Sequence, residues 1–236
     1  MKPIVFAGPS IFGLDTARLD IAFRPPAASG DLLAAVQAGA KVIGLIDGFY
    51  GNSAAVWHKE ILYALTEGVV IVGGASMGAL RAAECAPFGM IGIGEIFEAY
   101  RDGRRVCDGD VAISHAPAEL GYRPLSIALV DAEATIADAA DILGAADVDL
   151  LLKAARSLHF HRRTWRSIVA QAGLGKGHLA ILAANTVSVK RRDAERLVSM
   201  LADCAPFPQA SRAWTFQNTI FFDELRRRMS ASDAAR

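Results

Sequence analysis

A serine between two glycines is the pattern in this chain with the clearest chemical meaning. Gly74, Ser76 and Gly78 form a GxSxG motif between an apolar run and an alanine-rich segment. Small residues on both sides of a serine allow a tight strand-to-helix turn that exposes a nucleophilic hydroxyl. The same turn also suits a serine that caps a helix or binds a phosphate. The motif therefore predicts either acyl-transfer chemistry or a capping or anion-binding role at Ser76.

The flanks of this serine predict a strand, a turn and a helix. Residues 69–72 are all apolar and β-branched, as in a strand buried on both faces of a parallel sheet. Residues 79–83 are rich in Ala and Leu, which favour a helix. Free N–H groups at the start of that helix would stabilise an anion. The N–H of Met77 is one expected oxyanion donor, and that of Gly8 or Ser10 is the second, because Pro9 has no N–H.

The residues around Asp47 supply one set of candidate partners for Ser76. Asp47 follows a predicted strand, and His58 and Glu60 come one short loop later. An Asp, a His and a Ser in this order match the chain order of one serine-hydrolase arrangement. In this interpretation His58 is the general base, and Asp47 or Glu60 orients its ring. The alternatives are a turn role for Asp47 and a solvent-exposed His58.

A polar-rich segment at residues 106–126 supplies a second set of candidates. The apolar run 111–114 ends at His115, which predicts a further strand end and makes His115 a competing partner for Ser76. Three other residues of the segment are expected to bind the substrate or complete the site: Glu119, Tyr122 and Arg123. Arg81, Arg123 or a helix N-terminus could offset a substrate's negative charge. For Arg81, an ion pair with Glu84 three residues later is the simpler interpretation.

Composition limits the fold and the class of protein. The 236 residues are 53% hydrophobic, enough for one sizeable domain, and no apolar run has the length of a membrane span. The N-terminus lacks the pattern of a signal peptide, so we expect a cytoplasmic protein. Three widely spaced cysteines, Cys85, Cys107 and Cys204, argue against a disulfide framework or a zinc site. Asp108 and Asp110 lack calcium-loop spacing, and we expect no metal or other cofactor.

The net charge of zero conceals an asymmetry along the chain. Residues 1–150 contain 10 Lys and Arg against 19 Asp and Glu, and residues 151–236 contain the other 15 against 6. The first part is therefore −9 and the second +9. Such a split indicates that the two parts pack together, that the basic part binds an acidic partner, or that the charges cover solvated helices. The aromatic residues of the basic part fit core positions better than base stacking, so nucleic-acid binding is not expected.

The first hundred residues alternate strand and helix patterns. The predicted strands are 3–7, 21–24, 41–46 and 69–72, and the predicted helices between them are 30–38 and 54–65. This βαβαβα order predicts an α/β fold with an open, mainly parallel, Rossmann-like sheet. Because ligands bind beyond the carboxyl ends of such strands, Gly8-Pro9-Ser10, Asp47 and Ser76 would line one crevice if their strands are neighbours.

The remainder of the chain has a helical pattern. Helices are predicted at 132–143, 147–157, 161–172, 193–203 and 211–229. We therefore predict a core domain of residues 1–130 and a helical C-terminal region, residues 131–236, that packs on the core or flanks it.

Several motifs, taken together, resemble the TfuA-like proteins, which accompany YcaO enzymes. The resemblance covers about residues 4–130. It is carried by FAGPS at 6–10, RPPA and the following GDLL at 24–33, GLIDGFY at 44–50, VWHKEILYAL at 56–65, GASMGALRAAE at 74–84 and DGDVAISHAPAELGYRPLS at 108–126. The helical region that follows is less distinctive.

This resemblance implies a role in peptide backbone thioamidation. There the YcaO enzyme activates an amide with ATP, and its TfuA-like companion helps to supply sulfur. The family is associated with hydrolysis of a thiocarboxylated, ubiquitin-like sulfur carrier of the ThiS type, which releases sulfide. A serine with an oxyanion hole suits this substrate, because a thiocarboxylate is an acyl group with a sulfur leaving group. The expected partners are a YcaO enzyme and the carrier. The sequence leaves open whether the protein also forms a homo-oligomer.

Two alternatives remain beside the serine mechanism. Water activated by His58 or His115 would hydrolyse the thiocarboxylate with no covalent step, and Ser76 would only bind the tail. Alternatively, the protein is a non-catalytic adaptor that holds the YcaO enzyme, the carrier and the peptide together, which would account for the basic region. Nucleotide binding is not expected, since the chain lacks the P-loop lysine and the GxGxxG fingerprint.

Overall fold

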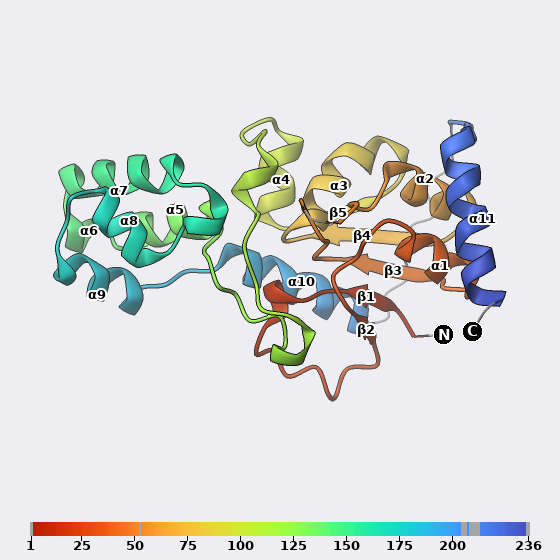
Figure 1. The fold of residues 1–236 in the computed structure, drawn as a ribbon, viewed down its shortest axis with the longest axis horizontal. Coiled ribbons are helices and arrows are strands. Elements are labelled where there is room, and N and C mark those ends of the chain that lie inside the picture. Colours follow the sequence, from red (N-terminus) through yellow and green to blue (C-terminus); the bar gives the residue numbers. More distant parts are fainter. Residues whose placement is uncertain (1, 52, 204–206, 208–212, 235–236) are drawn as a thin grey trace.

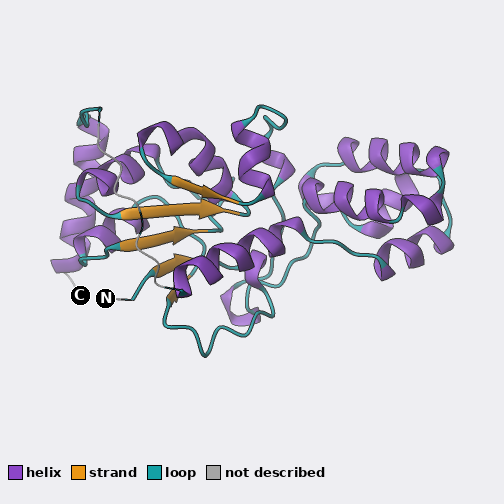
Figure 2. Ribbon diagram, turned by 180° about the vertical axis from the view of Figure 1, so that it is seen from behind, coloured by secondary structure: helices purple, strands orange, loops and turns teal. Residues whose placement is uncertain are grey.

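One all-parallel sheet organises the N-terminal half of the molecule (Figures 1 and 2). The structure is a computed structural model that describes residues 2–51, 53–203, 207 and 213–234. Its strands are β1 (Ile4–Phe6), β2 (Ala22–Arg24), β3 (Val42–Leu45), β4 (Val70–Gly74) and β5 (Ile91–Ile93). They pair in the order β2-β1-β3-β4-β5. The predicted open, parallel α/β sheet is therefore confirmed.

Two local strand predictions differ from the structure. The fifth strand, β5, was not predicted, because it has three residues and a central glycine that weakens the strand pattern. A Cβ at Gly92 would stand 2.2 Å from the ring of Phe97, so the glycine makes room for that ring. The strand predicted at 111–114 is wrong. This segment follows a short 3₁₀ turn, Asp108–Asp110, and makes only an isolated antiparallel bridge between His115 and Pro124.

Helices cover both faces of the sheet. One face packs against α1 (Asp31–Gln37), α2 (His58–Thr66) and α3 (Met77–Cys85), and α4 (Glu95–Arg101) joins the same core. The other face packs against α10 (Val189–Ala202), through Val5 and Val72 among others. Gly44 lies on that second face, where a Cβ would be 2.7 Å from the Leu201 side chain. Burial on both faces is the reason that the strands are almost continuously apolar.

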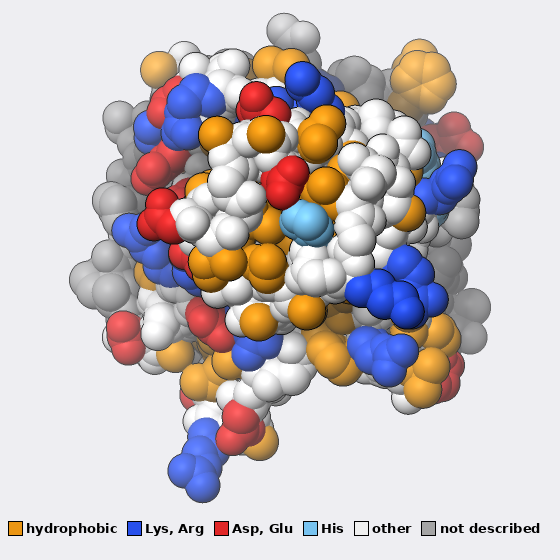
Figure 3. All heavy atoms as spheres, turned by 90° about the vertical axis from the view of Figure 1, so that its left-hand side faces the viewer, with side chains coloured by type: hydrophobic (Ala, Val, Ile, Leu, Met, Phe, Trp, Pro, Cys, Tyr) orange, Lys and Arg blue, Asp and Glu red, His pale blue; other side chains and the backbone are white. Residues whose placement is uncertain are grey.

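Five helices form a separate unit beside the sheet (Figure 1). They are α5 (Leu129–Asp138), α6 (Ala140–Leu143), α7 (Ala145–Ser157), α8 (Trp165–Gln171) and α9 (Lys176–Ala184). This helical unit has its own core, which includes the fully buried Ile136, Leu151, Ile168 and Leu182. The end that faces the viewer in Figure 3 carries apolar side chains among charged ones; Ile142 and Leu150 are exposed on the unit.

The chain returns from the helical unit to the α/β core. Besides α10, the last helix, α11 (Ile220–Ala234), packs on α1 through Phe222 and Leu33. The predicted C-terminal region 131–236 thus contains the helical unit together with two helices that complete the core. Of the helix predicted at 211–229, residues 211–212 lie outside the described residues, 213–219 are not helical, and α11 begins at Ile220. The helices α4 and α9 were not predicted.

The structure gives the positions of two cysteines and of the residues that could bind a metal. Cys85 is buried and Cys107 is exposed, both as free thiols, whereas Cys204 lies outside the described residues. Within the described residues, no group of three or more His, Cys, Asp or Glu side chains is arranged to hold a metal ion. No helix in the same part of the chain combines the length and apolar character needed to cross a bilayer.

Candidate active site

Ser76 lies in a strained turn between β4 and α3. The strain falls on Ala75, whose φ of +66° is a left-handed value that non-glycine residues rarely adopt. The Ser76 N–H donates to the Gly74 carbonyl at 2.8 Å, which closes a three-residue turn around Ala75. In the elbow that GxSxG predicts, the serine sits at the strained position. In this structure the strained residue is Ala75, and Ser76 itself has an ordinary φ of −126°.

Two glycines hold this turn against the sheet. A Cβ at Gly78 would stand 1.7 Å from the Leu45 carbonyl oxygen, and one at Gly73 would stand 2.2 Å from the Gly78 carbonyl oxygen. The Gly78 N–H donates to Ile46 O at 3.1 Å, so backbone packs directly on backbone. The second glycine of the motif is therefore needed for the close approach of α3 to β3.

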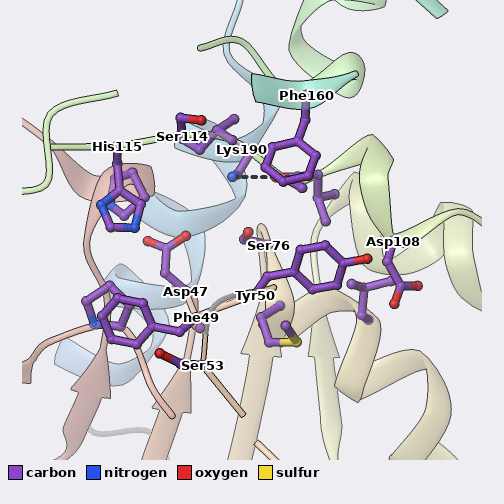
Figure 4. A pocket seen from close by; sticks show the side chains of 18 of the residues that line it. Asp47, Phe49, Tyr50, Ser53, Ser76, Asp108, Ser114, His115, Phe160 and Lys190 are labelled. Atoms are coloured by element: carbon purple, nitrogen blue, oxygen red, sulfur yellow. Dashed lines mark hydrogen bonds between the residues drawn. The ribbon is translucent and has the colours of Figure 1, made fainter. Parts of the chain in front are cut away.

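A pocket of about 380 Å³ opens at the carboxyl ends of β1, β3 and β4 (Figure 4). In a sheet of order 2-1-3-4-5 this is the switch point at which ligands bind. Pro9, Asp47 and Ser76 all line it, so the three strand ends meet as predicted. Its other walls come from the segment 108–115, from Phe160 and His161 of the helical unit, and from Lys190 of α10.

The Ser76 hydroxyl faces this pocket and is 9% exposed as a residue. No hydrogen-bond partner of the hydroxyl is found among the described residues. The N–H of Met77, the first residue of α3, likewise has no acceptor among them. A hydroxyl and a backbone N–H thus stand next to each other with unused hydrogen-bonding capacity, an arrangement that a covalent mechanism would need.

Asp47 has a different role from the one predicted. Its Oδ2 accepts from the N–H groups of Gly8 (2.9 Å) and Ser10 (3.0 Å), and its Oδ1 accepts from the Ser10 hydroxyl (2.7 Å). Asp47 therefore ties the loop after β1 to the end of β3 and orients no histidine in the structure. Because the N–H groups of Gly8 and Ser10 already donate to a carboxylate, Met77 is the donor of the predicted set that stays free.

His58 is not brought to Ser76. Its Nε2 lies 2.7 Å from Oε2 of Glu84, and the ring is half exposed outside the pocket. Arg81 donates to the same Glu84 oxygen at 2.7 Å and to the Val56 carbonyl at 3.0 Å, so it is also directed away from the pocket. Burial alone would raise the pKa of Glu84, but the hydrogen bonds from His58 and Arg81 outweigh it and lower that pKa. The predicted Asp47–His58–Ser76 triad is not assembled.

Glu60 is a capping residue in the protein interior. Its carboxylate accepts from the N–H groups of Gly30 (2.9 Å), Leu33 (3.4 Å) and Trp57 (3.1 Å), at the starts of α1 and α2. Burial raises the pKa of Glu60 to about 7, although these three backbone hydrogen bonds act to lower it. The Glu60 side chain thus holds two helix N-termini together instead of orienting His58.

His115 is the predicted histidine that does line the pocket with Ser76. Its Nδ1 lies 2.8 Å from the Ala116 carbonyl oxygen. A carbonyl can only accept, so Nδ1 carries the hydrogen and Nε2 of the neutral ring is left as an acceptor. The rings of Phe49 and Tyr122, with centroids at 6.1 and 5.6 Å, hold the imidazole in place. His115 thus has the tautomer of a general base.

The other residues predicted from segment 106–126 lie farther from the pocket. Glu119 and Arg123 are exposed and do not line it. Tyr122 has a left-handed φ of +58° and contributes its ring to the packing of His115.

Lys190 is one of the pocket residues that sequence reasoning missed, together with Phe160 and His161. It is 3% exposed, and its Nζ donates to the Val111 carbonyl at 2.8 Å. Burial lowers the pKa of Lys190, against the opposing effect of Asp47 and Asp131. Asp131 of α5 accepts from the Lys190 N–H and the Ser188 hydroxyl, both at 3.1 Å, and so fixes the start of α10. One signal was available, because Lys190, Ala194, Leu197 and Leu201 share one helical face.

The fold and the pocket define a class: an α/β protein with a pocket at the switch point of a parallel sheet, partly walled by an added helical unit. The model of the TfuA-like protein family matches residues 47–164, which is half of the 236 residues. The chain belongs to the TfuA-like family. No relative was found among curated proteins. The matched region contains Ser76, His115 and the helical-unit residues of the pocket, whereas Lys190 lies beyond it.

Proposed function

We propose that the protein hydrolyses the thiocarboxylated C-terminal tail of a ubiquitin-like sulfur carrier of the ThiS type. The sulfide released would serve YcaO-dependent thioamidation, the process with which the TfuA-like family is associated. The observation that carries the proposal is that one pocket is lined by Ser76 with a free hydroxyl, by Met77 with a free N–H and by His115 with an acceptor nitrogen. In the described structure no hydrogen bond joins Ser76 to His115, so the proposal requires the two side chains to approach when the substrate binds. These are the parts that acyl transfer from a thiocarboxylate needs.

In the proposed reaction, the Ser76 oxygen attacks the carbonyl carbon of the thiocarboxylate. His115 Nε2 takes the hydroxyl proton, and the Met77 N–H binds the oxyanion. The C–S bond then breaks, and the sulfur leaves as hydrosulfide; in the overall balance its proton replaces the one that Ser76 gave up. Water hydrolyses the acyl-serine to a carboxylate, a proton and the free hydroxyl. The net change is thiocarboxylate plus water to carboxylate plus hydrogen sulfide.

The pocket walls support a substrate with a narrow, protruding tail. Phe49 and Tyr50 from the core and Phe160 from the helical unit line the space around Ser76 (Figure 4). The rings of Tyr50 and Phe160 meet edge to face at 6.1 Å. A volume of about 380 Å³ accepts the end of an extended peptide and excludes a folded protein surface.

The test is a defined mixture of the purified protein and a thiocarboxylated carrier. We expect sulfide release together with conversion of the carrier to its carboxylate, measured by a sulfide assay and intact mass. Rapid acid quenching should trap a covalent adduct of protein and carrier. A carrier that binds but keeps its thiocarboxylate would overturn the hydrolytic function and favour the adaptor role. Turnover that survives in Ser76→Ala would favour directly activated water.

A further inference from the structure

A thiocarboxylate presents a difficulty that Ser76 and His115 do not resolve. The substrate is an anion at neutral pH, and its charge makes the carbonyl carbon a poor electrophile. Attack by the serine oxygen would place a second negative charge beside the first, in a pocket of low dielectric. The site therefore needs a positive charge or a proton at the sulfur.

The arginines suggested by the sequence do not supply that charge. Arg81 binds Glu84 and the Val56 carbonyl outside the pocket, and Arg123 is exposed away from it. Lys190 is the only lysine or arginine among the described residues that line the pocket. Figure 4 shows its amine end directed into the space that Ser76 and Asp47 also face.

Lys190 also has unused capacity for an anion. An ammonium group has three N–H donors, and in the described structure the Val111 carbonyl accepts from one of them. Among the described residues, no carboxylate lies within ion-pairing distance of Nζ. The Asp47 carboxylate is instead satisfied by two backbone N–H groups and a hydroxyl. A buried ammonium without a paired anion is costly, and an anionic ligand in the pocket would supply the missing partner.

We propose that Lys190 binds the thiocarboxylate and transfers a proton to its sulfur, so that Ser76 attacks a neutral thioacid. This step rests on the proposed function. The proton moves from Nζ to sulfur, the serine oxygen bonds to the carbonyl carbon, and the C–S bond breaks to release hydrosulfide. The proton that His115 takes from Ser76 passes through water to restore the ammonium. Burial favours the first transfer, because it weakens the hold of Nζ on its proton.

Lys190→Met tests the inference, because methionine fills similar space without a charge. Two substrates with the same carrier tail are compared, one ending in a thiocarboxylate and one in an uncharged phenyl ester. We expect the variant to hydrolyse the thiocarboxylate on the order of 100-fold more slowly and the ester within a few-fold of the wild-type rate. Ser76→Ala should lose both reactions. Lys176→Met, at an exposed position of α9, should change neither.

The other outcomes decide against the inference. If Lys190→Met slows both substrates equally while its thermal unfolding is unchanged, Lys190 serves Ser76 instead of the anion. Unchanged rates on both substrates would remove Lys190 from the mechanism.

Failure of the wild-type protein to hydrolyse either substrate would overturn the proposed function, and calorimetry then tests Lys190 alone. The tail peptide with a free carboxylate should bind about tenfold more tightly than its amide, and Lys190→Met should abolish that preference. Equal binding of the two peptides by the wild type would contradict the inference.

Discussion

Two clusters of polar side chains lie on or next to α3. They differ in how many of their hydrogen-bond donors and acceptors already have partners. The surface cluster of His58, Arg81 and Glu84 is partly exposed, and its charges bind one another. The pocket cluster of Ser76, His115 and Lys190 lines a concave pocket and leaves a hydroxyl, an imidazole nitrogen and ammonium protons unused. Both contain residue types common in catalysis. The difference makes the pocket cluster the stronger candidate for a reactive site, because its side chains keep bonding capacity that a substrate can use.

Removal of the Ser76 hydroxyl is the change expected to lower activity most. Ser76→Ala should lower the rate of sulfide release by about 10⁴-fold or more, since the remaining groups act through the serine. Ser53→Ala, which alters another hydroxyl of the same pocket, should stay within about twofold by the same reasoning. Single-turnover kinetics with saturating protein would measure both. Equal losses of rate in the two variants would mean that any substitution in the pocket impairs it. Ser76 would then have no special role, and the contrast between the pocket cluster and the surface cluster would no longer hold.

The histidine of the pocket cluster is expected to have the next largest effect. His115→Gln should lower the rate by about 10²- to 10³-fold, because general base catalysis is lost. His161→Gln is the matched control. Its Nδ1 lies 2.6 Å from the Ser114 hydroxyl, at the helical-unit side of the same pocket, and we expect a loss of less than about tenfold. A larger loss in His161→Gln than in His115→Gln would reassign the base.

Glu60 offers a third case for the comparison. Its carboxylate is buried like the pocket cluster, but it already accepts three backbone hydrogen bonds. Its pKa is about 7 in the folded protein and near its ordinary value of 4.5 in the unfolded chain. Between these values the unfolded chain loses its proton first, so the free energy of unfolding falls as pH rises. The total loss is about 3 kcal/mol, complete above pH 7.

Urea denaturation of Glu60→Gln at a series of pH values would measure this effect. The variant cannot ionise at that position, so its unfolding free energy should rise relative to wild type by the same amount between pH 4.5 and 8. Glu67→Gln, at the exposed end of α2, should run parallel to the wild type. A parallel curve for Glu60→Gln would show that the carboxylate is stabilised as an ion.

A substitution in the surface cluster should have the smallest effect on stability and on sulfide release. His58→Ala removes a half-exposed partner of Glu84 and should change stability by less than about 1 kcal/mol. Sulfide release should stay within about twofold, because the ring does not line the pocket. A loss comparable with that of Ser76→Ala would restore the triad predicted from chain order and would require α2 to move when the carrier binds.

Local patterns were sufficient for the sheet and for the strand ends that meet at the pocket. Four strands lie at or near their predicted positions, because each is a short apolar run bounded by turn residues. His58 shows where such reasoning fails. Spacing placed it one loop after Asp47, but as the first residue of α2 it faces Glu84 and Arg81.

Lys190 shows a second limit. It is the second residue of a helix rich in Lys, Arg, Asp and Glu, and such a stretch indicates a solvated face. Its burial results from the packing of α10 on the far face of the sheet, with Leu197 and Leu201 against Gly44. That contact joins residues more than a hundred positions apart in the chain, and no local pattern encodes it.

The glycine contacts beneath α3 determine which parts of the site can be adjusted separately. Ser76 and the Met77 N–H are consecutive in the chain, and Gly78 locks both against the carbonyl of Leu45. A side chain at position 78 would clash with the Leu45 carbonyl and would therefore displace the Ser76 hydroxyl and the Met77 N–H together. His115 and Lys190 come from independent segments. Engineering of this pocket toward other acyl substrates should therefore vary residues 108–114 and the start of α10, and keep His115 and residues 73–78 fixed.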